Sequence, residues 1–178
     1  MSMLQDDWNR CVEFHGHSCP GLAIGYRASK AVQEKLNLRF SQDEELVCVT
    51  ENDACGVDAV QFLTGCTMGK GNLIHKATGK MAFSFFCRAS GAKLRLIFKP
   101  SFPSGQMDRT AWQEHILQAP LDELFDFKEP TYEPPEKARL FSRLICAKCG
   151  EGMAEHKARH QDGKTVCLDC MPGYSRGW

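Results

Sequence analysis

The sequence has no excess of charge of either sign and no long apolar run. Lysine and arginine total 22, as do aspartate and glutamate, so no overall field attracts nucleic acid or an anionic membrane. No apolar stretch approaches the roughly 20 residues that a membrane-spanning helix requires. The first ten residues, MSMLQDDWNR, do not have the basic and apolar segments of a secretory leader. We therefore expect a cytoplasmic protein without a membrane partner.

Cysteine, in contrast, is abundant: ten of the 178 residues. In the reducing cytosol this count favours metal ligands, reactive thiols and buried core cysteines over a disulfide framework. Cys11, Cys48 and Cys87 fall on faces of predicted helices or strands, and we expect them in the core.

The order of patterns along the chain predicts an α+β core followed by a linker and a small C-terminal domain. Apolar periodicity and glycine or proline boundaries predict helices at 8–15, 20–36, 56–65 and 107–118, and strands at 45–52, 81–88 and 92–100, the last two as a hairpin. At KEPTYEPPEKAR, three prolines and alternating charges are typical of a linker. We expect domains at 1–130 and 141–178, joined by a linker at 131–140.

The second predicted helix carries small residues four apart at Gly21, Gly25 and Ser29. An interior glycine destabilises a helix by about 1 kcal/mol relative to alanine. We therefore expect this stripe to allow the close approach of another backbone.

The C-terminal segment contains two C-x-x-C pairs, Cys146 with Cys149 and Cys167 with Cys170, separated by 17 residues. This spacing is typical of zinc ribbons, in which four thiolates hold one structural Zn²⁺; four unrelated cysteines or two redox dithiols are the alternatives. Residues 131–178 carry eight basic and six acidic side chains. Because a four-thiolate zinc site would bring their net charge to about zero, we expect this domain to be structural or to contact protein rather than to bind nucleic acid.

A second group of candidate ligands lies around two predicted helix starts. Pro20 favours the first helical turn, which puts Cys19 at the N-cap, where the helix dipole and free N–H groups favour a thiolate. Cys55 precedes the helix of VTENDACGVDAV in the same way. His17, Cys19 and Cys55 would then form a three-ligand metal site with one open position, as in catalytic zinc centres. His15 and Asp58 lie nearby, and simple helix caps are the alternative roles for both.

Two blocks, FHGHSCPGLAIGYRA and ENDACGVDAVQFLTGCTMGKGNL, resemble conserved parts of the formylmethanofuran dehydrogenase FmdE proteins. The resemblance covers about residues 8–100, and members of that family often carry a C-terminal zinc-finger segment. It implies an αβαβββ core with a mixed sheet, similar to the catalytic domain of glyceraldehyde-3-phosphate dehydrogenases, and a homodimer. It also implies a pocket in which His17, Cys19 and Cys55 hold a metal, with four neighbours: His15, Asp58, Cys66 and Thr67.

The leading hypothesis is a metal-binding protein of one-carbon or molybdenum/tungsten-enzyme metabolism, with a structural zinc in the tail and zinc or another transition metal in the core. If the core site is catalytic, Cys55 would hold a metal that polarises a carbonyl or activates water, while Asp58 or His15 transfers protons. Two alternatives stay open. One is an accessory or sensor protein that docks an oxidoreductase through the zinc domain. The other is a metal-free thiol enzyme with Cys55 as nucleophile. The sequence does not decide whether the protein is an enzyme, nor which small molecule it binds.

Overall fold

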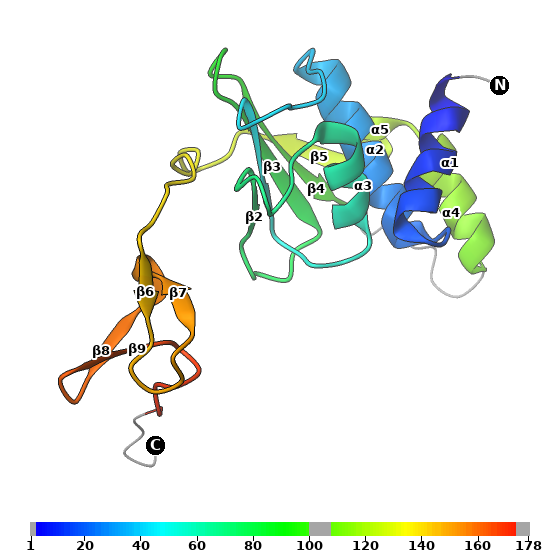
Figure 1. Ribbon diagram of the computed structural model, residues 1–178. Helices are drawn as coiled ribbons and strands as arrows, with labels where there is room; N and C mark the ends of the chain where they lie inside the picture. Colours follow the sequence, from blue (N-terminus) through cyan, green and yellow to red (C-terminus); the bar gives the residue numbers. More distant parts are fainter. Residues whose placement is uncertain (1–2, 100–107, 174–178) are drawn as a thin grey trace. The chain divides into compact units, whose positions relative to one another are not determined.

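The computed structural model describes residues 3–99 and 108–173 and divides the chain into two compact units, Met1–Ala138 and Arg139–Trp178 (Figure 1). The ends of two predicted elements, Pro100 and Met107, lie outside the described residues. The first unit contains five helices and a sheet, and the second contains two small hairpins, counted over the described residues. This is the expected α+β core with a small cysteine-rich domain.

Three helices in the first unit agree with the predicted positions. α1 (Met3–His15) starts earlier than expected, and α2 (Pro20–Lys35) and α3 (Gly56–Thr64) begin where the proline and glycine signals placed them. Gly65 ends α3 at φ +73°, and its N–H donates to the Gln61 carbonyl. A glycine in this left-handed conformation is the usual helix terminator, because it has no Cβ.

The sheet has the strand order β2-β1-β3-β4-β5. β1 pairs in parallel with β2 and antiparallel with β3, and the remaining pairs are antiparallel, so the sheet is mixed. The expected αβαβββ arrangement is confirmed by α2, β1, α3, β2, β3 and β4 in chain order. Sequence patterns missed β2 and β5, which are too short to show a clear alternation. The strand bounds are β1 Leu46–Thr50, β2 Leu73–His75, β3 Ala82–Cys87, β4 Lys93–Phe98 and β5 Phe125–Lys128.

The helices cover one face of the sheet, and the main core lies between them (Figure 1). Alternate strand residues such as Phe83, Phe85 and Leu96 point into this core and pack with Leu22 and Val32 of α2. Their side chains are almost completely buried, which removes large apolar areas from water and stabilises the fold.

α4 (Arg109–Gln118) and the short α5 (Leu121–Leu124) complete the helical layer. The carboxylate of Asp108 caps α4 by accepting from the Thr110 and Ala111 N–H groups at 2.8 Å. Arg27 of α2 donates to the carbonyls of Leu117 and Ala119 at the other end of α4. α4 is therefore fixed to the helix that carries Cys19 at its N-cap.

The segment 129–138, predicted largely as a linker, runs along the opposite face of the sheet. The Tyr132 ring packs on Phe86 with centroids 5.7 Å apart, beside buried Val47 and Val49. The Arg88 guanidinium donates to the Pro135 carbonyl at 2.7 Å. We call residues 129–138 the strap, because they cover this second apolar cluster up to the boundary of the first unit.

α2 and α3 approach each other at the expected small-residue stripe. A Cβ added to Gly25 would lie 2.0 Å from the Gly56 carbonyl oxygen, and one added to Gly56 would lie 2.9 Å from the Gly21 oxygen. Ser29 belongs to the same stripe and donates its hydroxyl to the Gly25 carbonyl. Only glycine allows this separation, so the sequence brings the starts of α2 and α3 together.

The second unit consists of two hairpins around the four cysteines. β6 (Arg143–Ile145) pairs with β7 (Gly152–Ala154), and β8 (Arg159–Gln161) pairs with β9 (Lys164–Val166), with a short 3₁₀ helix between the hairpins. Only Cys146 and Val166 are buried among its described residues 139–173. This apolar core is too small to stabilise such a unit, so another source of stability is needed.

Candidate metal centres

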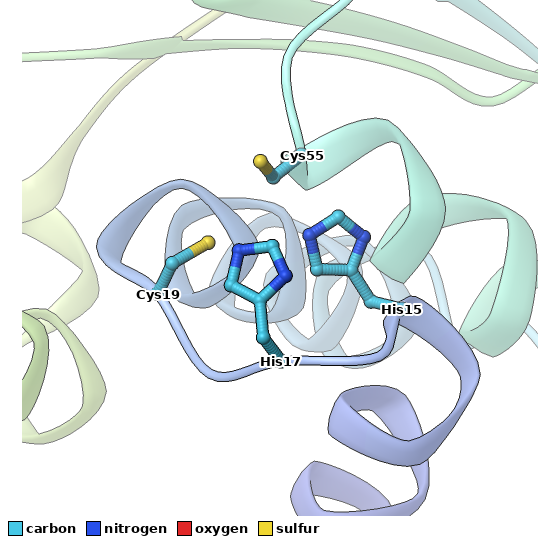
Figure 2. A group of neighbouring side chains, drawn as sticks. All are labelled: His15, His17, Cys19 and Cys55. Atoms are coloured by element: carbon cyan, nitrogen blue, oxygen red, sulfur yellow. The ribbon is translucent and has the colours of Figure 1, made fainter.

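Four side chains from three elements converge in the first unit (Figure 2). His15 ends α1, His17 lies in the loop that follows, and Cys19 and Cys55 precede α2 and α3. Each offers one nitrogen or sulfur donor, and these atoms all lie within 4.8 Å of one another. We call these residues the core group. The three predicted ligands are thus brought together, and His15, predicted as a neighbour, joins them as a fourth donor.

Asp58 fixes the orientation of the His15 ring. Its Oδ2 lies 2.6 Å from His15 Nδ1, so Nδ1 donates its proton to the carboxylate. The other ring nitrogen, Nε2, is buried and has no hydrogen-bond partner in the described part of the chain. A buried polar atom without a partner is costly, and a histidine held by a carboxylate is the usual arrangement around a bound transition metal.

The two cysteines of the core group are held by the helices that they precede. Cys19 is 2% exposed and caps α2, and its Sγ accepts from the Leu22 N–H at 3.3 Å. Cys55 begins α3 without a side-chain cap bond. Burial and the neighbouring Cys19 thiol raise the pKa of the Cys55 thiol. In a free protein this disfavours a thiolate, which is the form that a metal ion stabilises.

The residues fit a transition-metal ion of the borderline-soft class. Two imidazoles and two thiols are the donors that zinc, copper, nickel and cobalt prefer, whereas magnesium and calcium prefer oxygen. The buried His15 Nε2 without a hydrogen-bond partner is a second, separate indication that an ion binds here.

A cavity of about 380 Å³ lies beside the core group on the side of His15 and Cys55. Sequence analysis missed several of its lining residues, including Thr50 and His75 on the adjacent ends of β1 and β2. The parallel pairing of these strands is the signal that would have found them, but β2 itself was not predicted. The described lining consists of His15, Thr50, Asn52, Asp53, Ala54, Cys55, Val57, Asp58, Gln61, Met68, Leu73 and His75.

Cys66 and Thr67, expected as pocket neighbours, do not line this cavity. The Cys66 thiol is fully buried and donates to the Leu46 carbonyl at 3.6 Å, and burial raises its pKa to about 11. Thr67 lines a different cavity, near Phe14 and Phe62. Neither residue therefore forms part of the cavity beside the core group.

The other core cysteines are placed largely as expected. Cys11 and Cys48 are fully buried, and burial raises the pKa of the Cys11 thiol to about 12. Cys87 is half-buried at the end of β3 and is therefore less enclosed than predicted.

The four C-terminal cysteines form a second group, which we call the tail group. One sulfur from each of Cys146, Cys149, Cys167 and Cys170 lies within 4.8 Å of the others. The Cys146 Sγ accepts from the N–H groups of Cys167 at 3.3 Å and Lys148 at 3.4 Å. Backbone N–H groups near this sulfur lower the pKa of Cys146 to about 6. Four convergent sulfurs with N–H donors are the features of a structural four-cysteine metal site.

Among the residues that the structure describes, no helix combines the length and apolarity that crossing a membrane would demand.

Comparison with known proteins gives a family match and two informative relatives. The family model described as "FmdE, Molybdenum formylmethanofuran dehydrogenase operon" matches residues 14–126. A protein of Archaeoglobus fulgidus, named a probable S-adenosyl-L-methionine-binding protein, is 30% identical over 197 aligned positions. That alignment covers 93% of this chain and 52% of the relative, so the chain spans about half the relative's length.

A solved structure from Syntrophus aciditrophicus, named as a tungsten formylmethanofuran dehydrogenase FmdE-like protein, has a TM-score of 0.68 against this chain. It is 23% identical, with coverage of 94% of this chain and 91% of the other, and this likeness shows the shared fold. The family model spans more than half of the chain, including the core group and the cavity beside it. The chain therefore belongs to the FmdE family.

Proposed function

We propose that this protein binds two metal ions and acts in one-carbon or molybdenum/tungsten-enzyme metabolism. His15, His17, Cys19 and Cys55 would hold zinc or another transition metal, and the tail group would hold a structural zinc. The single observation that carries the core site is the buried, unpartnered Nε2 of His15 beside two thiols. The metabolic context is supported by the description of the family and the name of the solved relative.

The core residues have separate roles in this proposal. Asp58 would keep the proton on His15 Nδ1, so that Nε2 carries the lone pair. That role differs from the proton-transfer role first expected for Asp58 and His15, because the carboxylate is already occupied by the imidazole. A bound zinc ion would supply Lewis acidity toward a carbonyl or water at the cavity edge. The cavity beside Cys55 would admit a small molecule and limit its contact with bulk water.

The alternative of a metal-free thiol enzyme is weaker than the metal site. A nucleophilic cysteine needs a lowered pKa, whereas burial and the Cys19 thiol raise the pKa of Cys55. His15 keeps Nε2 free as a candidate base, because Nδ1 carries the proton toward Asp58, so the weakness of this alternative lies in the thiol.

An accessory or sensor role remains the second candidate function. Five large apolar residues of the second unit are exposed: Leu140, Phe141, Ile145, Leu168 and Met171. A small domain that exposes so many can dock a protein partner, and we propose an oxidoreductase as that partner. We also propose a cytoplasmic homodimer.

Metal analysis of the full-length chain tests the core site. Cys19→Ser and Cys55→Ser should each lower the bound zinc from two ions per chain to one. Cys87→Ser, which changes a half-buried cysteine outside both groups, should keep two ions. If both serine variants of the core group keep two ions, the proposed site is wrong.

A further inference from the structure

The four donors of the core group are held with unequal firmness. The His15 side chain is 11% exposed and is tied to Asp58. Cys19 is buried and bonded to a backbone N–H of α2. Cys55 is the N-cap of α3, where the Gly25–Gly56 contact fixes the helix start against α2. Moving any of these three donors requires breaking packed structure.

His17 has none of these restraints. It is exposed and lies in the short loop between α1 and α2, next to Gly16 at φ +91°. Within the described residues no hydrogen bond or ion pair holds its ring, which touches the His15 ring with centroids 4.4 Å apart. Nearby, the Ser18 hydroxyl of the same loop donates to the Gln113 side chain of α4 at 2.8 Å. A rotation about the His17 side-chain bonds can therefore remove its imidazole from the group while the loop stays in place.

We propose that His17 is the exchangeable donor of the core group, whereas His15, Cys19 and Cys55 are the permanent ones. This inference rests on the proposed function, because it assumes that the core group binds a metal ion. When His17 swings out, the vacated position faces solvent and accepts a small nitrogen or sulfur donor, such as an imidazole or a thiol. The three permanent donors are one nitrogen and two sulfurs, so an ion that they select also prefers soft ligands at the fourth position.

Zinc retention and the rate of zinc exchange should depend on different donors here, whereas in a rigid four-ligand site both would depend on all four donors. Removing a permanent donor should abolish binding, since the ion would then lose a ligand that the packed structure holds in place. Removing His17 should leave binding in place, since water or a solute can reach the vacated position. The exposed imidazole would then control how fast the ion is exchanged rather than whether it is held.

Zinc release from the full-length protein to a chromogenic chelator tests the inference. The variants are His17→Ala, His17→Gln and His15→Ala, with His115→Ala as control because His115 is also a histidine of this unit but lies outside the core group and does not line the cavity beside it. Wild type, His115→Ala and both His17 variants should retain two zinc ions per chain after dialysis, and His15→Ala should retain one. The His17 variants should release one ion about tenfold faster than wild type, the lower end of the usual effect of perturbing a ligand's surroundings. Added imidazole should slow that release again in His17→Ala and should affect wild type much less, because His17 already fills the position for most of the time.

Cobalt substitution gives a readout that does not depend on release rates. Imidazole added to cobalt-loaded His17→Ala should shift the visible absorption bands of the core ion, because it binds the cobalt directly. The same addition to His115→Ala should have no effect.

The outcomes distinguish the inference from the proposed function. If wild type retains one ion and Cys19→Ser also retains one, the core metal site itself is wrong. If wild type retains two ions but His17→Ala retains one, like His15→Ala, then His17 is a permanent ligand and the inference is wrong. If His17→Ala releases zinc as slowly as wild type and does not respond to imidazole, then His17 is no ligand and the inference is equally wrong.

Discussion

The contact between Gly25 and Gly56 gives the sharpest test of how the fold builds the core group. In Gly25→Ala the new Cβ would lie 2.0 Å from the Gly56 carbonyl oxygen and 2.4 Å from its Cα. Ordinary contact for a Cβ begins at 3.4 Å, so α2 and α3 would have to separate by about 1.4 Å. The obstructing atoms are backbone, which cannot rotate away as a side chain would.

The expected cost exceeds the gain in helix propensity. Alanine favours a helix interior over glycine by about 1 kcal/mol, whereas overpacking a rigid contact costs about 1–3 kcal/mol and occasionally more. Because both clashing partners are backbone, we expect the upper end of that range and a net loss of about 2 kcal/mol. The separation would also move the Cys19 thiol away from Cys55, so the variant should bind the core zinc ion more weakly.

Urea unfolding and zinc analysis of Gly25→Ala measure both effects. Gly69→Ala is the matched control, because a Cβ there meets no atom within 4 Å and Gly69 is not among the glycines with positive φ. The control should match wild type in unfolding midpoint and zinc content. A Gly25→Ala protein that is as stable as wild type and binds two ions equally tightly would refute the argument that this contact positions the two thiols.

Three further predictions follow from other contacts. Asp58→Ala should weaken zinc binding in the core group about tenfold, measured by chelator competition, whereas Asp53→Ala, an exposed carboxylate at the same cavity, should not. Burial raises the pKa of Glu51, but hydrogen bonds from Arg95 and Thr78 outweigh it and hold this pKa below its ordinary value. The folding stability from this pair should be complete above the ordinary pKa and lost as pH falls through the lowered one, as urea midpoints against pH would show. Arg95→Met should cost about 3–5 kcal/mol because it removes the ion-pair partner of a buried carboxylate. Lys99→Met, at a half-exposed pair, should cost less than about 1 kcal/mol. Chelation should unfold residues 139–173, which bury only Cys146 and Val166, and should leave the sheet of the first unit intact by limited proteolysis. A cysteine-rich unit that resists protease without metal would contradict that dependence.

The parts of the site that sequence analysis predicted are those with local signals. Pro20 after Cys19 marks a helix start, and the strand-to-helix change around Cys55 marks another. Two C-x-x-C pairs at zinc-ribbon spacing predict that four sulfurs converge, because the turn within each pair can point both of its sulfurs at one ion. The small residues Gly21, Gly25 and Ser29, spaced four apart, likewise predict a close helix contact. They do not show which helix makes that contact.

The parts that it missed depend on contacts between distant residues. Nothing local shows that His15 is a donor, since its ring direction is set by Asp58, 43 residues away. His75 reaches the cavity only because the three-residue β2 pairs in parallel with β1. The strap has the composition of a linker, yet Tyr132 finds an apolar cluster on the outer face of the sheet. The composition of the strap predicts a free linker, but the apolar face of the sheet under Tyr132 holds this segment in place.

The two metal groups differ in charge, and this difference orders their affinities. A divalent ion on two thiolates and two neutral imidazoles makes the core site neutral, whereas four thiolates leave the tail site with a net charge of about −2. The starts of α2 and α3 both face the core group, and their partial positive charges stabilise its thiolates but oppose the approach of a cation. The tail cysteines precede no helix of that length in the described residues. The core ion should therefore leave first when a chelator is titrated into the wild-type protein, and the tail ion should follow at higher chelator concentration. Cys149→Ser would retain only the core ion and Cys19→Ser only the tail ion, so a chelator titration of each variant measures one site. If the tail ion leaves at the lower chelator concentration, helix dipoles and net charge do not control affinity at these sites.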